Sequence, residues 1–336
     1  MFLSDNDYHL QGAKALRQER PAVKARRFIT GVAGATAMVA LLAGCAATSA
    51  SEAQGSGSGA AHKIVAIGAE SQYTSVISQI GGKYVSATSV MSNPNTDPHS
   101  FEASARVASQ LSGAALVVQN GLGYDGFMDK IEAASPAADR IVISAQQVRG
   151  LPDGTRNPHL WYDPKTMPAV AKRISAALTK LQPSHASYFA ANLAKFTTSL
   201  AKWTDAIAAF RNAHPSIPIA TTEPVADYLL EAAGTKNRTP WAFQASIMND
   251  TDPEPQDVAI QSALFTGHKV KVFLYNQQVT DAITATYLKL AKQNGIPVVG
   301  VYETMPAQGY NYQTWMEAEL AALTKAVADG VSTEKL

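Results

Sequence analysis

Four side chains that could bind a metal ion follow predicted strands along the chain, two in each half. His99 and His159 each follow a proline, and Glu223 and Glu303 each follow a short apolar run. In open parallel sheets, ligands bind beyond the carboxyl ends of the strands. We therefore expect these side chains to converge on one cleft, and we treat the four as candidate metal ligands.

The chemistry of this set is that of a site for a divalent transition metal ion. Neutral imidazole and carboxylate oxygen are the ligands expected for Mn²⁺, Fe²⁺ or Zn²⁺. Two of each around one ion give a near-neutral site, which helps a buried ion to stay bound. Pro98 and Pro158 stiffen the turns that present the histidines, because proline restricts its own backbone and that of the preceding residue. Protons compete for the imidazoles, so metal affinity should fall in mildly acidic medium.

Residue type alone leaves an ordinary explanation open for each of the four. A single histidine after a strand is more often a loop or capping residue, and a single glutamate in a loop is usually solvated. Histidine content by itself is not informative, because other histidines are scattered along the chain: His62, His185, His214 and His268.

Strands that alternate with helices must position these residues. In the first half we predict strands at 63–68, 84–90, 115–119 and 140–144, with helices at 71–80, 103–112 and 124–134. This alternation is typical of a parallel sheet flanked by helices.

Helical patterns replace the alternation after residue 164. Segments 165–181 and 184–212 are both helical in pattern, with Pro183 between them. The second helix would be about 43 Å long if straight, which suits a connector between two lobes. The alternation then resumes, with strands predicted at 217–221, 241–244, 270–275 and 297–301 and helices at 226–233, 255–266, 280–294 and 312–328.

The predicted fold class is therefore α/β, with two parallel-sheet lobes flanked by helices and joined by a long connecting helix. We place the N-terminal lobe at 62–164, the connecting segment at 165–214 and the C-terminal lobe at 215–336. Hydrophobic residues make up 46% of the chain, which is ample for a core. The net charge of +1 gives no indication of a nucleic-acid partner.

The first 44 residues have the pattern of a lipoprotein signal peptide. Lys24, Arg26 and Arg27 precede an apolar run at 28–43, which has the length of a signal-peptide core rather than of a membrane span. The run ends in Leu-Ala-Gly-Cys, which resembles the bacterial lipobox and predicts lipidation of Cys45. The alternative is a buried free cysteine.

Cys45 is the only cysteine, so the chain has no intrachain disulfide and no multi-cysteine zinc site. Segment 45–61 is rich in Ala, Ser and Gly and should behave as a flexible tether. We therefore expect an extracytoplasmic protein that is lipid-anchored to the bacterial cell membrane.

The segments around the two candidate histidines resemble the signatures of a known family. DPHSFE at 97–102, followed by LVVQNGLGY at 116–124, resembles the first signature of the cluster A-I metal-binding proteins. PHLWYDP at 158–164 resembles the second signature. Members of this family are the solute-binding subunits of zinc and manganese ABC importers. The resemblance extends over about residues 63–328, including the long helix.

This resemblance implies that His99, His159, Glu223 and Glu303 are the four metal ligands. Glutamate at the third position is common in manganese-type members, whereas the fourth is usually the shorter aspartate. Asn157 stands where the family often has aspartate. The resemblance also implies a monomeric binding protein, not an enzyme, whose partners are an ABC permease and its ATPase subunit.

The ligand types favour manganese or Fe²⁺ over zinc, because two carboxylates make a harder set than three histidines. Zinc remains close behind, since most such sites bind Zn²⁺ more tightly than Mn²⁺ in solution. A zinc metallohydrolase would keep three ligands and an open position, and the chain has no His-Glu-x-x-His motif. A surface adhesin or a binding protein for another solute is a further alternative.

Overall fold

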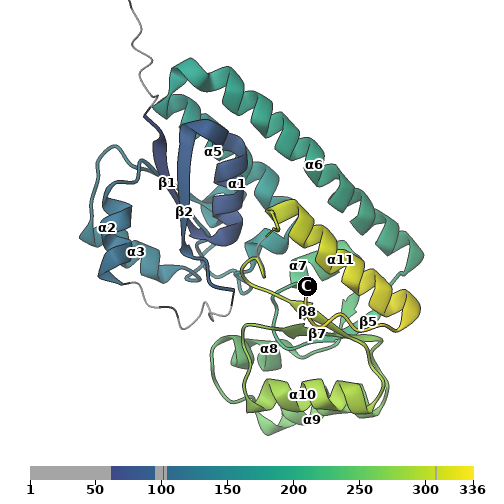
Figure 1. Cartoon of the computed structure of the whole chain (residues 1–336). Helices are drawn as coiled ribbons and strands as arrows, with labels where there is room; N and C mark the ends of the chain where they lie inside the picture. Colours follow the sequence, from purple (N-terminus) through teal and green to yellow (C-terminus); the bar gives the residue numbers. More distant parts are fainter. Residues whose placement is uncertain (1–61, 95–100, 102–103, 307–308) are drawn as a thin grey trace, which may run out of the picture. The chain divides into compact units, whose positions relative to one another are not determined.

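The computed structural model describes residues 62–94, 101, 104–306 and 309–336 (Figure 1). The predicted α/β class is confirmed, because the described chain forms two four-stranded parallel sheets flanked by helices. The predicted signal peptide, the lipidated Cys45, the tether and His99 lie outside the described residues. The predicted domain boundaries stay predictions.

The first sheet has the strand order β2-β1-β3-β4. Its strands are β1 (Ile64–Glu70), β2 (Val85–Met91), β3 (Leu116–Gln119) and β4 (Ile141–Ser144). The helices of this region are α1 (Ser71–Gly81), α2 (Ala105–Ser112), α3 (Gly126–Ala134) and α4 (Ala145–Arg149).

Neighbouring side chains of each strand enter different cores, because successive residues of a strand point to opposite faces of the sheet. In β3, Leu116 and Val118 pack with Trp161 and the long helices, whereas Val117 packs with residues of α2 and α3. Both faces of this sheet are therefore covered, as parallel sheets require.

The two long helices are α5 (Thr166–Leu181) and α6 (Ala186–Ala213). The side chains that α6 buries form one stripe, with Phe189 two turns before a series that recurs every three or four residues: Phe196, Leu200, Trp203, Ile207 and Phe210. Helix α6 packs against α1, α5 and α11 (Tyr312–Asp329) and runs alongside both sheets (Figure 1). One hydrophobic core consequently includes residues of both sheets, such as Leu116 and Leu274.

The second sheet has the order β6-β5-β7-β8. Its strands are β5 (Pro218–Thr221), β6 (Lys236–Asn237), β7 (Val272–Asn276) and β8 (Val298–Val301). Its other helices are α7 (Asp227–Ala232), α8 (Trp241–Met248), α9 (Pro255–Thr266) and α10 (Ala282–Gln293), and Figure 1 shows α9 and α10 together on one side of this sheet.

The strand predicted at 241–244 is wrong, because this segment begins α8. A short apolar run fits a buried strand and a buried helix equally well. Phe243, Ile247 and Met248 are buried at helical spacing, and Pro240 stands just before the first helical residue, where its missing N–H costs nothing. The fourth strand of the sheet is instead the two-residue β6.

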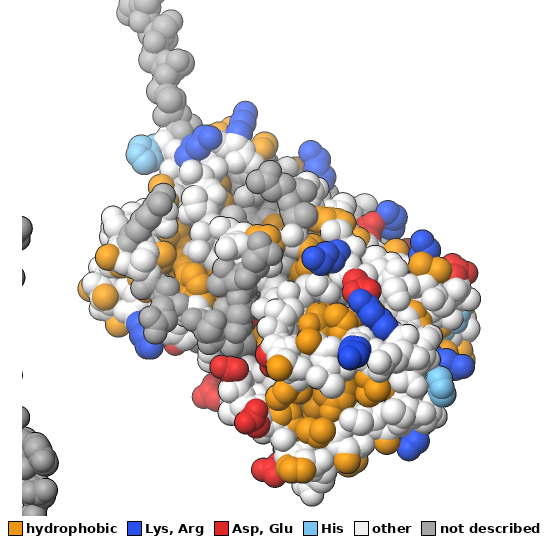
Figure 2. All heavy atoms as spheres, turned by 60° about the horizontal axis from the view of Figure 1, so that its bottom comes forward, with side chains coloured by type: hydrophobic (Ala, Val, Ile, Leu, Met, Phe, Trp, Pro, Cys, Tyr) orange, Lys and Arg blue, Asp and Glu red, His pale blue; other side chains and the backbone are white. Residues whose placement is uncertain are grey.

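The exterior of the described chain has no strongly basic face in the view of Figure 2, where Lys and Arg side chains are scattered among apolar and acidic ones. Among the described residues, no helix combines the length and the apolar character that crossing a bilayer would need.

Candidate metal centre

His159 lies fully buried in the loop between α4 and α5, immediately before a 3₁₀ turn at Leu160–Tyr162. Its Nδ1 is 2.7 Å from Oδ1 of Asn157, and the same oxygen accepts the backbone N–H of His159 at 3.0 Å. An oxygen that accepts both bonds places the imidazole proton on Nδ1. Nε2 then carries the lone pair and lies 3.3 Å from Oε2 of Glu303, so a cation entering there would meet both atoms.

Asn157 also joins the two lobes. Its Nδ2 donates to the carbonyl of Pro224 at 2.8 Å, directly after candidate ligand Glu223, and its own carbonyl accepts from the Tyr228 hydroxyl at 2.9 Å. The bond to Pro224 fixes which end of the Asn157 amide faces His159. A departure from the family pattern therefore supplies the group that orients the histidine.

Glu303 follows β8, is fully buried and contacts residues of both lobes. Its Oε2 lies 3.3 Å from Nε2 of His159 and accepts the Tyr124 hydroxyl at 3.0 Å. Its backbone N–H donates to Gln278 at 2.6 Å, and its carbonyl accepts from Gln72 at 3.1 Å. These bonds hold the carboxylate against the histidine of the other lobe.

Asn276, the last residue of β7, links the two candidate glutamates. Its Nδ2 donates to Oε1 of Glu303 at 2.7 Å and to Oε1 of Glu223 at 2.9 Å. Glu223 is 2% exposed and follows β5. The Asn276 amide is itself fixed, because its Oδ1 accepts the backbone N–H of Gln278 at 3.0 Å. Two buried carboxylates are thus held on one amide group, and a buried pair of like charges favours a cation.

The structure brings three of the four predicted ligands together through short contacts: His159 with Glu303, and Glu223 with Glu303 through Asn276. The fourth, His99, lies outside the described residues. Within the described ranges, no three His, Cys, Asp or Glu side chains are already arranged to hold an ion. Binding of an ion would therefore require these side chains to move locally, or a further ligand from outside the described residues.

The turn between β3 and α3 supports the histidine side of this cluster. The carboxylate of Asp125 accepts the backbone N–H groups of Asn120 and Gly121, where φ is +87°. Asn120 in turn donates to the carbonyl of Pro158 at 2.8 Å. Burial raises the pKa of the Asp125 carboxyl to about 6 despite these hydrogen bonds. Burial, followed by the nearby charges of Glu303 and Glu70, also raises the pKa of the Tyr124 hydroxyl well above its usual range, so it stays a donor.

Comparison with known proteins decides the family. The model of the family described as zinc-uptake complex component A, periplasmic (ZnuA), matches residues 69–326. The chain belongs to this family. The match confirms the resemblance drawn from the sequence, and it spans both lobes and the long helices.

Individual relatives of this ZnuA-family chain bear metal-related names. The chain is 29% identical over 161 residues to the manganese-binding lipoprotein MntA of Bacillus subtilis (strain 168), a match that covers 46% of this chain and 50% of that protein. The chain thus matches about half the length of that curated relative.

Two solved structures share the fold. A Mn-bound periplasmic metal binding protein from candidatus liberibacter asiaticus superposes with a TM-score of 0.63, and a crystal structure of ZnuA does so with 0.64. Each is 18% identical to this chain, and each match covers 79% of this chain and 100% of the other.

A cavity of about 400 Å³ lies beside the cluster in this ZnuA-family chain, between the β3–α3 turn and α8. Tyr124 and Pro158 line it on one side, and Trp241 lines it on the other. Arg156 is 6.0 Å from the centre of the Trp241 ring, which is a cation–π distance. The cavity therefore borders Pro158, which precedes His159, and Tyr124, whose hydroxyl donates to Glu303.

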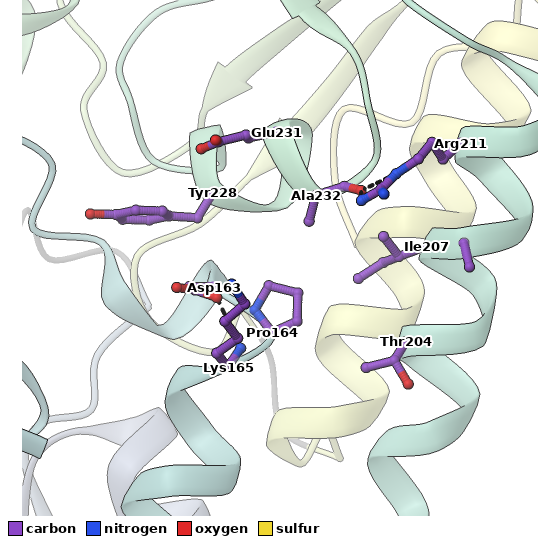
Figure 3. A pocket seen from close by; sticks show the side chains of 10 residues that line it. Asp163, Pro164, Lys165, Thr204, Ile207, Arg211, Tyr228, Glu231 and Ala232 are labelled. Carbon is purple, nitrogen blue, oxygen red and sulfur yellow. Dashed lines mark hydrogen bonds between the residues drawn. The ribbon is translucent and has the colours of Figure 1, made fainter. Parts of the chain in front are cut away.

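A second cavity, of about 440 Å³, lies between the start of α5, α6 and α7 (Figure 3). Its wall carries the basic residues Lys165 and Arg211 as well as Asp163 and Glu231. Asp163 is paired with Arg149 at 2.8 Å, outside the lining. This mixture of charges does not make a cation site.

Sequence reasoning missed the residues that hold the ligands. Asn276 stands at the end of a predicted strand, so the strand-end rule could have found it had amides been considered. Tyr124 lies within the family-like segment at 116–124, but no local signal shows that its hydroxyl reaches Glu303. The roles of Asn157 and Gln72 depend on contacts between distant segments and have no signal in the sequence.

Proposed function

We propose that this protein captures a divalent transition metal ion outside the cytoplasm and delivers it to an ABC importer. The observation that carries the proposal is the meeting of His159 from one lobe with Glu303 from the other, next to a second buried carboxylate held on the same amide. Imidazole nitrogen and carboxylate oxygen are the donor types that such ions take. Membership in the ZnuA family supports the same function.

The proposed ligands are His99, His159, Glu223 and Glu303. Nε2 of His159 is the coordinating atom, because Nδ1 is engaged with Asn157. Asn276 keeps the two carboxylates side by side until the ion replaces its N–H groups or shares the carboxylates with them. Tyr124 and Gln72 hold Glu303 in place from the N-terminal lobe.

Manganese is the proposed physiological cargo, with zinc as the alternative and Fe²⁺ also compatible. Two carboxylates make the donor set rich in oxygen, which harder ions prefer. The partly matching relative from Bacillus subtilis is named a manganese-binding lipoprotein. Zinc will still compete in solution because of its higher intrinsic affinity for most N/O sites.

Capture and release then proceed by local movements around the cluster. One hydrophobic core includes residues of both sheets, and α6 contributes a buried stripe to it. A wide hinge opening would expose part of that core and lose its burial free energy. The ion is passed to a membrane permease driven by an ATPase subunit, while a lipid on Cys45 keeps the monomeric protein at the membrane.

Calorimetric titration of the full-length chain in detergent tests the proposal. The protein is stripped with a chelator and titrated separately with Mn²⁺ and Zn²⁺, and the bound metal is verified by elemental analysis. We expect one ion per chain for the wild type and for His62→Ala, which removes an exposed histidine. We expect a large loss of affinity for His159→Ala. The absence of stoichiometric metal, or equal affinity in His159→Ala, would contradict the proposal.

A further inference from the structure

One buried carboxyl near the cluster formed by His159, Glu223 and Glu303 has no hydrogen-bond partner among the described residues. Glu70 ends β1 and is 0% exposed, and neither oxygen of its carboxyl has a hydrogen-bond partner in the described structure. It also occupies the residue just before α1, where a short polar side chain such as Asp or Ser commonly accepts a backbone N–H of the helix, and the longer Glu70 accepts none there. The residues next to Glu70 in the chain therefore do not explain why a carboxyl is buried at this position.

The segment that carries Glu70 lies against the turn that carries Glu303. The backbone N–H of Met305 donates to the Ser71 hydroxyl at 3.0 Å, and Gln72 donates to the carbonyl of Glu303 at 3.1 Å. The residues on the C-terminal side of Glu70 thus bind residues 303–305 directly. This places the orphan carboxyl at the carboxyl end of the first sheet, beside the cluster.

The electrostatics agree with this placement. Burial raises the pKa of the Glu70 carboxyl well above its usual range, the charges of Asp125 and Glu303 raise it further, and its own backbone N–H offsets part of the increase. Glu303 and Glu70 also both act on the Tyr124 hydroxyl. Glu70 therefore shares a buried environment with a candidate ligand and with the hydroxyl that holds that ligand.

A carboxyl in this position weakens the metal-free protein. Burying a polar group without a hydrogen bond is unfavourable, and burying its ionised form is more so. An apolar side chain of similar size would pack there without this cost. A role in folding does not explain Glu70, whereas a cation entering beside Glu303 would supply the missing partner.

We propose that Glu70 is an additional carboxylate of the metal centre, which contacts the captured ion directly or through one bound water and favours Mn²⁺ over Zn²⁺. The proposal rests on the function proposed above. An additional oxygen donor makes the set harder and allows a coordination number above four, which Mn²⁺ accepts more readily than Zn²⁺. Because His159, Glu303 and Glu70 do not already surround one point, the Glu70 side chain rotates toward the ion when it binds.

Two substitutions separate a metal-binding role from a structural one. Glu70→Leu removes the polar group, and Glu70→Gln keeps the shape but not the charge. The matched control is Glu319→Gln, which alters a glutamate that is equally buried but has hydrogen-bond partners. Each variant of the full-length chain is titrated with Mn²⁺ and with Zn²⁺, and its melting temperature is measured without metal.

We expect Glu70→Leu to melt at a higher temperature than the wild type without metal, and yet to bind Mn²⁺ at least about 10-fold more weakly. Its affinity for Zn²⁺ should fall less, and Glu70→Gln should show the same order of losses. Glu319→Gln should bind both ions like the wild type. If Glu70→Leu fails to fold, Glu70→Gln gives the same test of affinity.

Wild-type affinity for both ions in the two Glu70 variants would overturn this proposal alone. An equal loss for Mn²⁺ and Zn²⁺ would overturn the part that concerns selectivity. A wild type that binds neither ion stoichiometrically would overturn the proposed function and this inference with it.

Discussion

Glu70 and Glu319 both have almost no exposed surface, but they lie in contrasting surroundings. Glu319, on α11, receives the indole N–H of Trp315 at 2.6 Å and lies 2.7 and 2.8 Å from the Tyr162 hydroxyl. Glu70, at the β1–α1 junction, has no hydrogen-bond partner among the described residues. The same side chain is thus satisfied by the protein in one region and left to a ligand in the other.

The satisfied glutamate has a structural task. Burial raises the pKa of Glu319 to about 8, even though Tyr162 and Trp315 act in the opposite direction. The Tyr162 hydroxyl is the donor to this carboxyl and also to the carbonyl of Tyr302, which lies 2.8 Å away. These bonds tie α11 to Tyr162 and to the backbone just after β8.

Hydrogen bonding distinguishes a buried acid that stabilises the fold from one that serves a ligand. Where the carboxyl has hydrogen-bond partners, as at Glu319, its removal should lower folding stability and leave metal affinity unchanged. Where the carboxyl has no partner, as at Glu70, its removal should raise the stability of the metal-free protein and lower its metal affinity.

Glu223→Ala should weaken metal binding roughly 100-fold or more, about 3 kcal/mol, because it removes one of the two carboxylates that Asn276 holds together. Calorimetric titration of the stripped protein measures this. Glu231→Ala, which removes an exposed glutamate from the same part of the chain, is the matched control and should bind like the wild type. Equal affinities in the two variants would exclude Glu223 from the site.

Glu319→Gln should flatten the pH dependence of folding stability between about pH 4.5 and 8. The folded pKa of Glu319 lies near 8, above its ordinary value of 4.5, so the folded state binds the extra proton. The stability associated with this group is therefore fully present below pH 4.5 and is lost as the pH rises toward 8. Urea unfolding at pH 5 and pH 8 should show a smaller difference in the variant than in the wild type. An equal difference between pH 5 and pH 8 in the variant and the wild type would show that another group causes the pH dependence.

Glu319→Leu should lower the free energy of unfolding by about 1–3 kcal/mol, because it leaves the buried indole N–H of Trp315 without an acceptor. Glu70→Leu should change the stability of the metal-free protein in the opposite direction. Denaturant unfolding of both variants without metal measures the two effects. A loss of stability in both would show that Glu70 has a structural role after all.

Asn276→Ala should reduce metal affinity about 10-fold, because it removes the amide that keeps the two carboxylates in place without removing a ligand. Calorimetry with Mn²⁺ is the measurement. Asn237→Ala, which changes an amide that binds Thr221 and Asp227 instead, should leave the affinity unchanged. An unaffected Asn276 variant would mean that the carboxylates do not need this support.

Much of the fold could be predicted from the sequence, because the apolar runs and helical stripes are long and regular. The stripe of α6 and the strands β3 and β7 follow directly from such patterns. Segment 241–244 could not be assigned, since a run of four residues does not reveal its period. Its helical form depends on packing with α9 and the second sheet.

A single rule predicted some residues of the site from the sequence. The residues whose roles depend on tertiary contacts could not be predicted. The strand-end rule found Glu223 and Glu303, each of which lies two residues after a strand, whereas His159 lies in the loop that follows α4. Glu70 also ends a strand, but it lies between a predicted strand and a predicted helix and belongs to no family signature. Its lack of a partner is a property of the packed structure, and the sequence does not record it.

Anomalous diffraction from crystals grown with Mn²⁺, with Zn²⁺ as a second trial, would show whether ligands from both lobes meet on one ion. We expect one strong anomalous peak per chain within bonding distance of Nε2 of His159 and of carboxylate oxygens of Glu223 and Glu303. A peak that touches only one lobe, or lies away from all three side chains, would contradict this expectation.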